Sequence, residues 1–488
     1  MTSATRAVPA ASPVPPARPG AAAAIVVIFR DPVRTFLVLA VLVGGYLVFT
    51  VPYFGGIDEP AHFYRTYQIS TGQFVPEKLE GSKFSGACVP RDLVREVNGY
   101  QRAYFKHLVS LAPQAFANLE PAPAPAQAAP RCPSPDDQFL SSSTFGSPVP
   151  YLPQTAVILL ARTAGAGAGV MLLLGRVAVL LAYVALVAFA IRRAPRSKWG
   201  LCATALVPVA VFQSASSLSH DAMTTAVAIL VVSSALRALD PPPGVTPRAL
   251  VIEAVALSAL LGLCKPTYVV IAFAYLLPLL GSRERRARLW GLAPAAAFGV
   301  VVSVVWNQIV GNLWRTDSTY FGIRPNPPER RHELLTTPWH FAADALRTVP
   351  DQTWDWLKGL WGVGPSVTNW PAVVIVVAVL LFVAVALQRD RDEPRSLLWS
   401  QRALVLLLFV IGSALVFAAN YVYWTTPGDD TINGIQARYL VPLLALLPVA
   451  VGTPRLRALA ARDARFPVAV LLVPFFVVFA VSVTFRMH

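Results

Sequence analysis

The sequence predicts an all-helical membrane protein that crosses a lipid bilayer many times. Of its 488 residues, 55% are hydrophobic and only 14% are charged, whereas soluble domains carry about 25% charged residues. The net charge is +15, but the basic residues fall in short clusters between apolar runs. Such clusters fix the orientation of a membrane protein, so we expect membrane lipids and not nucleic acid as the surroundings of this chain.

About eleven apolar stretches approach the length of roughly 20 residues that a bilayer span requires. A tail over residues 1–22, rich in Ala and Pro, is expected to be disordered and cytoplasmic. Residues 23–488 are expected to form one transmembrane domain, which begins with an uncleaved anchor helix because no small-residue cleavage site follows its first span. The expected spans lie near residues 35–54, 168–191, 199–215, 219–237, 248–264, 267–281, 289–310, 371–388, 402–424, 437–452 and 466–485.

The short loops between these stretches predict the orientation of the chain. Loops near residues 192–198 and 283–288 carry clusters of Arg and Lys, whereas the alternate loops at 214–218 and 425–436 carry none. Basic loops stay in the cytoplasm. We therefore expect a bacterial plasma-membrane protein with its N-terminus inside, its C-terminus outside, and two long external loops, at residues 55–167 and 311–370.

The external loops are expected to hold helices that lie on the membrane surface. Residues 151–164 are apolar but too short to cross, which favours an interfacial helix. A pair of amphipathic helices is expected in the second loop, anchored at the interface by five tryptophans: Trp339, Trp354, Trp356, Trp361 and Trp370.

Two cysteines, Cys88 and Cys132, lie in the first external loop. An oxidising compartment permits a disulfide between them, and a pair of free thiols is the alternative. Cys202 and Cys264 lie in apolar segments and are expected to be small buried side chains.

The strongest chemical signal is the segment Gly55–Arg65, where the first span ends. An Asp before Glu-Pro favours a helix start, and from that start Asp58, His62 and Arg65 fall on one helical face. A carboxylate, an imidazole and a guanidinium at the bilayer surface can deprotonate a hydroxyl, bind a cation and hold a phosphate. A capped surface helix with solvated charges is the alternative.

A second acidic position lies in the expected external turn Ser216–Asp221, which also contains His220. Asp221 either caps the following helix or lies near Asp58 and shares a divalent cation with it, since hard cations prefer oxygen ligands. The metal prediction therefore has two ligands, Asp58 and Asp221, and names Mg²⁺ or Mn²⁺.

Several cations are also expected at or near the external face. Lys265 ends one span, Arg438 and Tyr439 begin another, and Arg176 lies about two turns inside a third. A charge at that depth is costly and is usually paired or functional. Together these cations can hold an anionic lipid headgroup, and snorkelling or structurally paired cations are the alternative.

The sequence has no phosphate-binding loop, dinucleotide fingerprint or cysteine metal motif, and its expected cytoplasmic loops are short. An enzyme that works outside must therefore take its activated substrate from the membrane. Expected substrate-binding residues are His62, Arg65, Arg176, His220, Asp221, Lys265, Arg438 and Tyr439.

From about residue 35 to the end, the chain resembles a bacterial family of polytopic membrane proteins of unknown function, which is similar to the GT-C glycosyltransferases. The motifs that carry the resemblance are Asp58–Phe63, Leu174–Arg176, Ser216–Asp221, Lys265–Tyr268 and Gln436–Pro442.

The resemblance implies that a sugar moves from a polyprenyl-phosphate donor to an envelope glycan, lipid or protein on the external face. Asp58 would be the general base with Glu59 beside it, Asp221 would be a second acidic group, and Arg438 and Lys265 would meet the donor phosphate. The second external turn has one acidic residue instead of a pair, which leaves a metal requirement open. Ala437 also stands where the family has glycine.

Two other functions stay open: a transporter or flippase of a lipid-linked glycan, and a non-enzymatic scaffold for envelope partners. Transporters place binding groups near the bilayer midplane, often on broken helices in matched halves. The sequence shows no internal repeat and, apart from Arg176, its candidate residues lie at one face. It therefore favours the enzyme.

Overall fold

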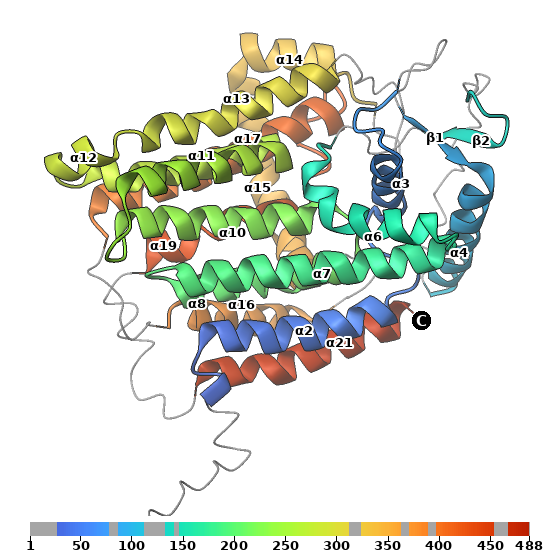
Figure 1. The fold of residues 1–488 in the computed structure, drawn as a ribbon, viewed down its shortest axis with the longest axis horizontal. Coiled ribbons are helices and arrows are strands. Elements are labelled where there is room, and N and C mark those ends of the chain that lie inside the picture. The colour runs from blue at the N-terminus through green and yellow to red at the C-terminus, as the bar shows by residue number, and fades with distance from the viewer. Residues whose placement is uncertain are drawn as a thin grey trace, which may run out of the picture.

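The computed structural model is a bundle of long helices that run side by side, with a smaller layer of short elements at one end (Figure 1). It describes residues 27–77, 86–111, 132–140, 146–311, 324–362, 370–388, 397–452 and 467–487. The expected N-terminal tail and parts of both expected external loops lie outside these residues.

Seven helices in the described part of the chain are long and apolar enough to span a membrane. This confirms a multi-pass helical membrane protein, while the count of eleven spans remains a prediction. The seven are α2 (Pro32–Thr50), α7 (Ala168–Arg193), α10 (His220–Leu239), α11 (Pro247–Cys264), α13 (Leu292–Gly311), α17 (Trp399–Trp424), and η4 (Val468–Leu471) joined to α21 (Leu472–Met487).

The other four expected spans are helical but broken or short. The span expected near residues 199–215 is bent by 57° between its two halves, and it gives an eighth candidate span if both halves are counted together. Prolines follow most of the breaks, and proline disfavours the interior of an α-helix because it lacks a backbone N–H. The elements are α8 (Lys198–Ala205) with α9 (Pro208–Ser216), η2 (Pro266–Leu280), α16 (Ala372–Ala386), and η3 (Ala437–Leu440) with α18 (Val441–Leu444) and α19 (Leu447–Val451).

The bundle is organised around α10, of which 94% of the apolar stretch is buried. It packs against α7, α11 and η2. Its sequence is rich in Ala, Ser and Thr, small side chains that allow helices to approach closely within a membrane. The central position of α10 matters for the site, because this helix begins with His220 and Asp221.

The layer at one end contains α3 (Glu59–Ser70), α4 (Arg91–Leu111), η1 (Val149–Tyr151) and α6 (Leu152–Thr163) (Figure 1). It also contains an antiparallel pair of strands, β1 (Ala87–Pro90) and β2 (Asp137–Leu140). The expectation of an all-helical chain was therefore wrong for this loop, where two short extended segments pair. A disulfide joins Cys88 of β1 to Cys132, so the bonded alternative is the one observed.

The second loop contains the expected pair of helices, α14 (Pro327–Thr336) and α15 (Pro338–Trp361). The tryptophans do not all behave as surface anchors. Trp339 is exposed, whereas Trp361 is buried with its ring centre 4.5 Å from that of Phe382. The difference follows the position along α15, because Trp339 lies at its start and Trp361 at its end, where the helix packs against α16.

One of the expected basic clusters lies at one end of the bundle. The basic helix α12 (Arg283–Leu289) lies at the end opposite α3 and α4, and α21 finishes at their end (Figure 1). This separation agrees with the charge pattern of the loops, and the direction in which the chain faces the membrane remains a prediction.

Candidate functional site

The site begins with a close contact between the loop before α3 and the turn before α10. A Cβ atom on Gly56 would lie only 1.7 Å from the carbonyl oxygen of Ser216, so a side chain cannot fit there. Ser217 Oγ donates to the carbonyl oxygen of Ile57 at 3.2 Å. The contact holds Asp58 next to the start of α10, although the two segments are far apart in the sequence.

Glu59 and Arg176 form an ion pair that is fully buried on both sides. Arg176 Nη2 lies 2.6 Å from Glu59 Oε2, and Nε lies 2.8 Å from Oε1. The same guanidinium donates to the carbonyl oxygens of Val48, Val51 and Pro52, where α2 ends. Both side chains are buried and fix the loop that carries Asp58, which favours a structural pair over the expected catalytic Glu59 and substrate-binding Arg176.

Arg65 also has a structural position. Its guanidinium is fully buried and donates to the carbonyl oxygens of Gly146 and Phe74 and to Gln68 Oε1. These bonds fix the loops at Phe74 and Gly146 to α3, and the expected substrate role of Arg65 stays a prediction.

Asp58 is the exposed acid of the site. Its backbone is left-handed, with φ of 55°, and its side chain makes no capping hydrogen bond to α3. The carboxylate instead lies 2.5 Å from Arg438 Nη2, and the Asp58 side chain is 52% exposed. Burial raises the pKa of Asp58, but the charge and hydrogen bond of Arg438 outweigh it, so the pKa lies below its ordinary value. The capping alternative is wrong, and Asp58 is ionised at neutral pH.

Asp221 lies between two cations. Ser219, not Asp221, caps α10 by accepting a hydrogen bond from the Asp221 backbone N–H. The Asp221 carboxylate lies 3.2 Å from Lys265 Nζ and 3.5 Å from Arg438 Nε. The expectation that Asp221 lies near the Asp58 site is therefore met, with Arg438 between the two acids.

This arrangement does not fit the expected divalent cation. The Arg438 guanidinium already lies between the carboxylates of Asp58 and Asp221, where a shared Mg²⁺ or Mn²⁺ would have to sit. Within the described ranges, no group of three or more His, Cys, Asp or Glu side chains could hold a metal ion.

Two histidines meet at a buried tyrosine beside the acids. Tyr151 Oη lies 2.8 Å from His62 Nδ1 and 3.0 Å from His220 Nδ1. Burial lowers the pKa of His62 to about 4, against the opposing influence of Asp58 and Asp221. A neutral His62 cannot hold a phosphate by charge. Both histidines are positioned by Tyr151, and His220 Nε2 approaches Asp221 Oδ1 at 3.6 Å.

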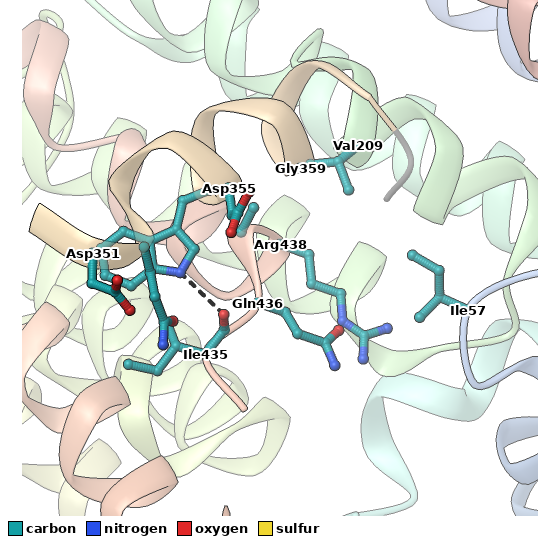
Figure 2. Close-up of a pocket in the computed structure, with 11 residues that line it drawn as sticks. Ile57, Val209, Asp351, Asp355, Gly359, Ile435, Gln436 and Arg438 are labelled. Atoms are coloured by element: carbon teal, nitrogen blue, oxygen red, sulfur yellow. Dashed lines mark hydrogen bonds between the residues drawn. The ribbon is translucent and has the colours of Figure 1, made fainter. Parts of the chain in front are cut away.

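Arg438 connects the acids to a cavity of about 550 Å³. Its side chain is 5% exposed, and among the described residues its Nη1 has no hydrogen-bond partner. Figure 2 shows the guanidinium directed toward Ile57, with the Gln436 amide beside it. A buried N–H without a partner is costly, so an anion that reached this atom from the cavity would satisfy it.

Tyr439 supports the cations instead of lining the cavity. Its ring centre lies 4.4 Å from Lys265 Nζ and 5.2 Å from the Arg438 guanidinium carbon. A cation over an aromatic face is attracted to it. Tyr268 Oη donates to the Tyr439 carbonyl oxygen at 2.8 Å and fixes this segment.

A family model described as a predicted membrane protein (DUF2142) matches residues 41–447. The chain belongs to the DUF2142 family. The match includes Asp58, Asp221, Lys265 and Arg438, so the whole cluster lies within the part of the chain that defines the family. No curated protein and no solved structure matches this chain.

The sequence motifs of this DUF2142 protein identified the charged centre but not its surroundings. Asp58, Asp221, Lys265 and Arg438 were each expected at one face, and the structure joins them. Tyr151 was missed because only the fold brings it between two histidines. The helix pair of the second loop was expected to shape the roof of a cavity, but the α15 residues that line it were not named.

Proposed function

We propose that this DUF2142 protein is a glycosyltransferase of the bacterial plasma membrane. It would move a pentosyl or hexosyl group from a polyprenyl-phosphate donor to an envelope glycan, lipid or protein on the external face. The observation that carries the proposal is the pairing of a half-exposed, ionised Asp58 with Arg438, which lines a cavity and whose buried Nη1 has no hydrogen-bond partner among the described residues.

The chemistry assigns a separate task to each charge. Arg438 and Lys265 offset the negative charge of the phosphate, which makes the lipid phosphate a better leaving group. Asp58 accepts the proton of the acceptor hydroxyl as its oxygen bonds to the anomeric carbon. The bond from that carbon to the phosphate oxygen breaks, polyprenyl phosphate leaves, and the proton remains on Asp58.

The proposal is tested with purified full-length protein in lipid vesicles. The vesicles receive polyprenyl phosphate carrying a radiolabelled sugar, and envelope material from cells that lack the protein serves as acceptor. We expect label in the acceptor with the wild type and with Asp92→Asn, an exposed acid outside the site, and none with Asp58→Asn. Full transfer by Asp58→Asn would exclude Asp58 as the base.

Translocation of a lipid-linked glycan is a second candidate, and one observation favours it. Broken helices are common in transporters, and the 57° bend between α8 and α9 is such a break. The same vesicles separate the candidates. Movement of a fluorescent lipid-linked glycan between leaflets, with no release of sugar to any acceptor, would support translocation and contradict the transferase.

A further inference from the structure

We propose that the cavity beside Arg438 is a sugar-phosphate site in which one face of α15 recognises the sugar hydroxyls. This inference rests on the proposed function and extends it, because it assigns the two ends of the donor headgroup to two walls of one cavity. The α15 face consists of Asp351, Gln352, Asp355, Trp356 and Gly359.

The cavity has the size of a small-molecule site. Its volume of about 550 Å³ lies within the range of roughly 300–1,000 Å³ that is typical of ligand pockets. Ile57 and Val209 contribute apolar surface, while the polar groups come from α15 on one side and from Gln436 and Arg438 on the other. An apolar surface with a few converging polar groups suits a sugar ring.

Regular helix geometry places the carboxylates on one wall. Asp351, Asp355 and Gly359 are separated by four residues each and therefore lie on one face of α15. In Figure 2, Asp351 and Asp355 lie on the side of the cavity away from Ile57, toward which the Arg438 guanidinium points. Carboxylates accept hydrogen bonds from hydroxyl groups and bind them more strongly than neutral acceptors do.

Two side chains of the same face tie α15 to the segment that precedes Arg438. Trp356 Nε1 donates to the carbonyl oxygen of Ile435, and Gln352 Nε2 donates to that of Ile432, both at 3.1 Å. Gly359 also approaches Ala437 so closely that an added Cβ would lie 2.7 Å from the Ala437 methyl. The acidic wall and the Arg438 wall therefore have a fixed separation, as recognition of one ligand requires.

Charge determines how a ligand lies in this cavity. The carboxylate of Asp351 repels a phosphate, and that of Asp355 does so less because Lys358 Nζ lies 2.8 Å from its Oδ1. The buried Nη1 of Arg438, which has no hydrogen-bond partner in the described part of the chain, attracts the phosphate. A ligand with an anion at one end and neutral hydroxyls at the other is thus held in one direction. The anion lies at Arg438 and the hydroxyls lie at α15.

The experiment compares two probes on the same purified full-length protein in detergent. One probe is farnesyl phosphate, and the other is farnesyl phosphate that carries a single mannose, glucose or arabinofuranose. We expect Asp351→Ala and Asp355→Ala each to weaken binding of the best sugar-bearing probe by about tenfold, the loss of a hydrogen bond to a charged group, and to leave farnesyl phosphate unchanged. Arg438→Lys should weaken binding of both probes.

The matched control is Asp92→Ala, which removes an exposed carboxylate of α4 outside the cavity and should leave both affinities unchanged. The ratio of the two affinities within one variant is the readout, because a general loss of fold would lower both together. An unchanged ratio in Asp351→Ala and Asp355→Ala overturns the proposal. It is also overturned if no sugar-bearing probe binds more tightly than farnesyl phosphate.

The binding experiment and the sugar-transfer experiment can fail separately. If Asp58→Asn transfers sugar normally, Asp58 is not the base, but the affinity ratio still reports on the α15 face. If the ratio is unchanged while Asp58→Asn loses transfer, the sugar site is wrong and the base assignment stands.

Discussion

At the scale of single residues, the buried Glu59–Arg176 pair is the principal support of the site. Replacing Arg176 with Ala leaves the Glu59 carboxylate buried without its cation, and loss of one partner of a buried pair costs about 3–5 kcal/mol. We expect a large fall in the thermal unfolding midpoint of the detergent-solubilised protein. Arg95→Ala, which breaks an exposed pair with Asp92, should change the midpoint little. Equal midpoints for the two variants would contradict the structural role of Arg176.

His62 predicts how stability responds to acid. Burial holds its pKa at about 4, below the ordinary value of 6.5 that it regains on unfolding. Between these values His62 binds more protons in the unfolded chain than in the folded protein. The stabilisation of the fold by a neutral His62 is therefore complete above about pH 6.5 and is lost as the pH falls toward 4. At pH 5 the loss is about 2 kcal/mol.

The measurement compares unfolding midpoints at pH 7 and pH 5. We expect the midpoint of His62→Gln to fall less than that of the wild type on acidification. His332→Gln, a change at an exposed histidine of α14, should respond as the wild type does. The account of His62 fails if all three proteins respond alike.

The motifs made some residue roles predictable and left others open. Charged residues next to span ends identified Asp58, Asp221, Lys265 and Arg438 as neighbours at one face. The ion-pair partner of each charged side chain could not be deduced from the sequence, because it depends on how deep that side chain lies in the helix bundle. Arg176 lies level with the end of α2 and therefore takes Glu59, which leaves Asp58 to Arg438.

At the scale of elements, the contact of the Gly56 loop with the turn before α10 brings the two acidic motifs together. Gly56→Ala would place a methyl group 1.7 Å from the Ser216 carbonyl oxygen, so the segments must separate. We expect loss of sugar transfer and a lower unfolding midpoint. In α2, Gly45→Ala has no atom within 4 Å of the new Cβ and should preserve both. Normal transfer by Gly56→Ala would show that the contact is not needed.

Hydrophobic runs predicted where helices lie, but not where they break. Each of the eleven expected stretches contains helix in the structure, yet in the described part of the chain seven helices, or eight with the bent pair, have the length and composition of a span. The bend after α8 and the 3₁₀ geometry of η2 depend on prolines and on packing against α10. The strands β1 and β2 were missed because strand pairing in a polar loop has no periodic signal.

At the scale of the whole molecule, the disulfide between Cys88 and Cys132 tests the orientation of the chain. A disulfide persists in an oxidising compartment, so the bond predicts that the layer that holds both cysteines lies outside the cytoplasm. We expect denatured protein from intact membranes to react with a maleimide at Cys202 and Cys264 alone, and at all four cysteines after reduction. Labelling of four cysteines without reduction would contradict an external position for this layer.

The most direct test of the account concerns Asp58 in living cells. Cells that lack the protein are given the wild type, Asp58→Asn or Asp92→Asn, and the glycan composition of their envelopes is compared at equal protein levels in the membrane. Asn tolerates the left-handed backbone of this position, so the change removes the charge with little strain. The account predicts that Asp58→Asn gives the same glycans as cells without the protein, whereas Asp92→Asn restores the wild-type composition. Restoration by Asp58→Asn would contradict it.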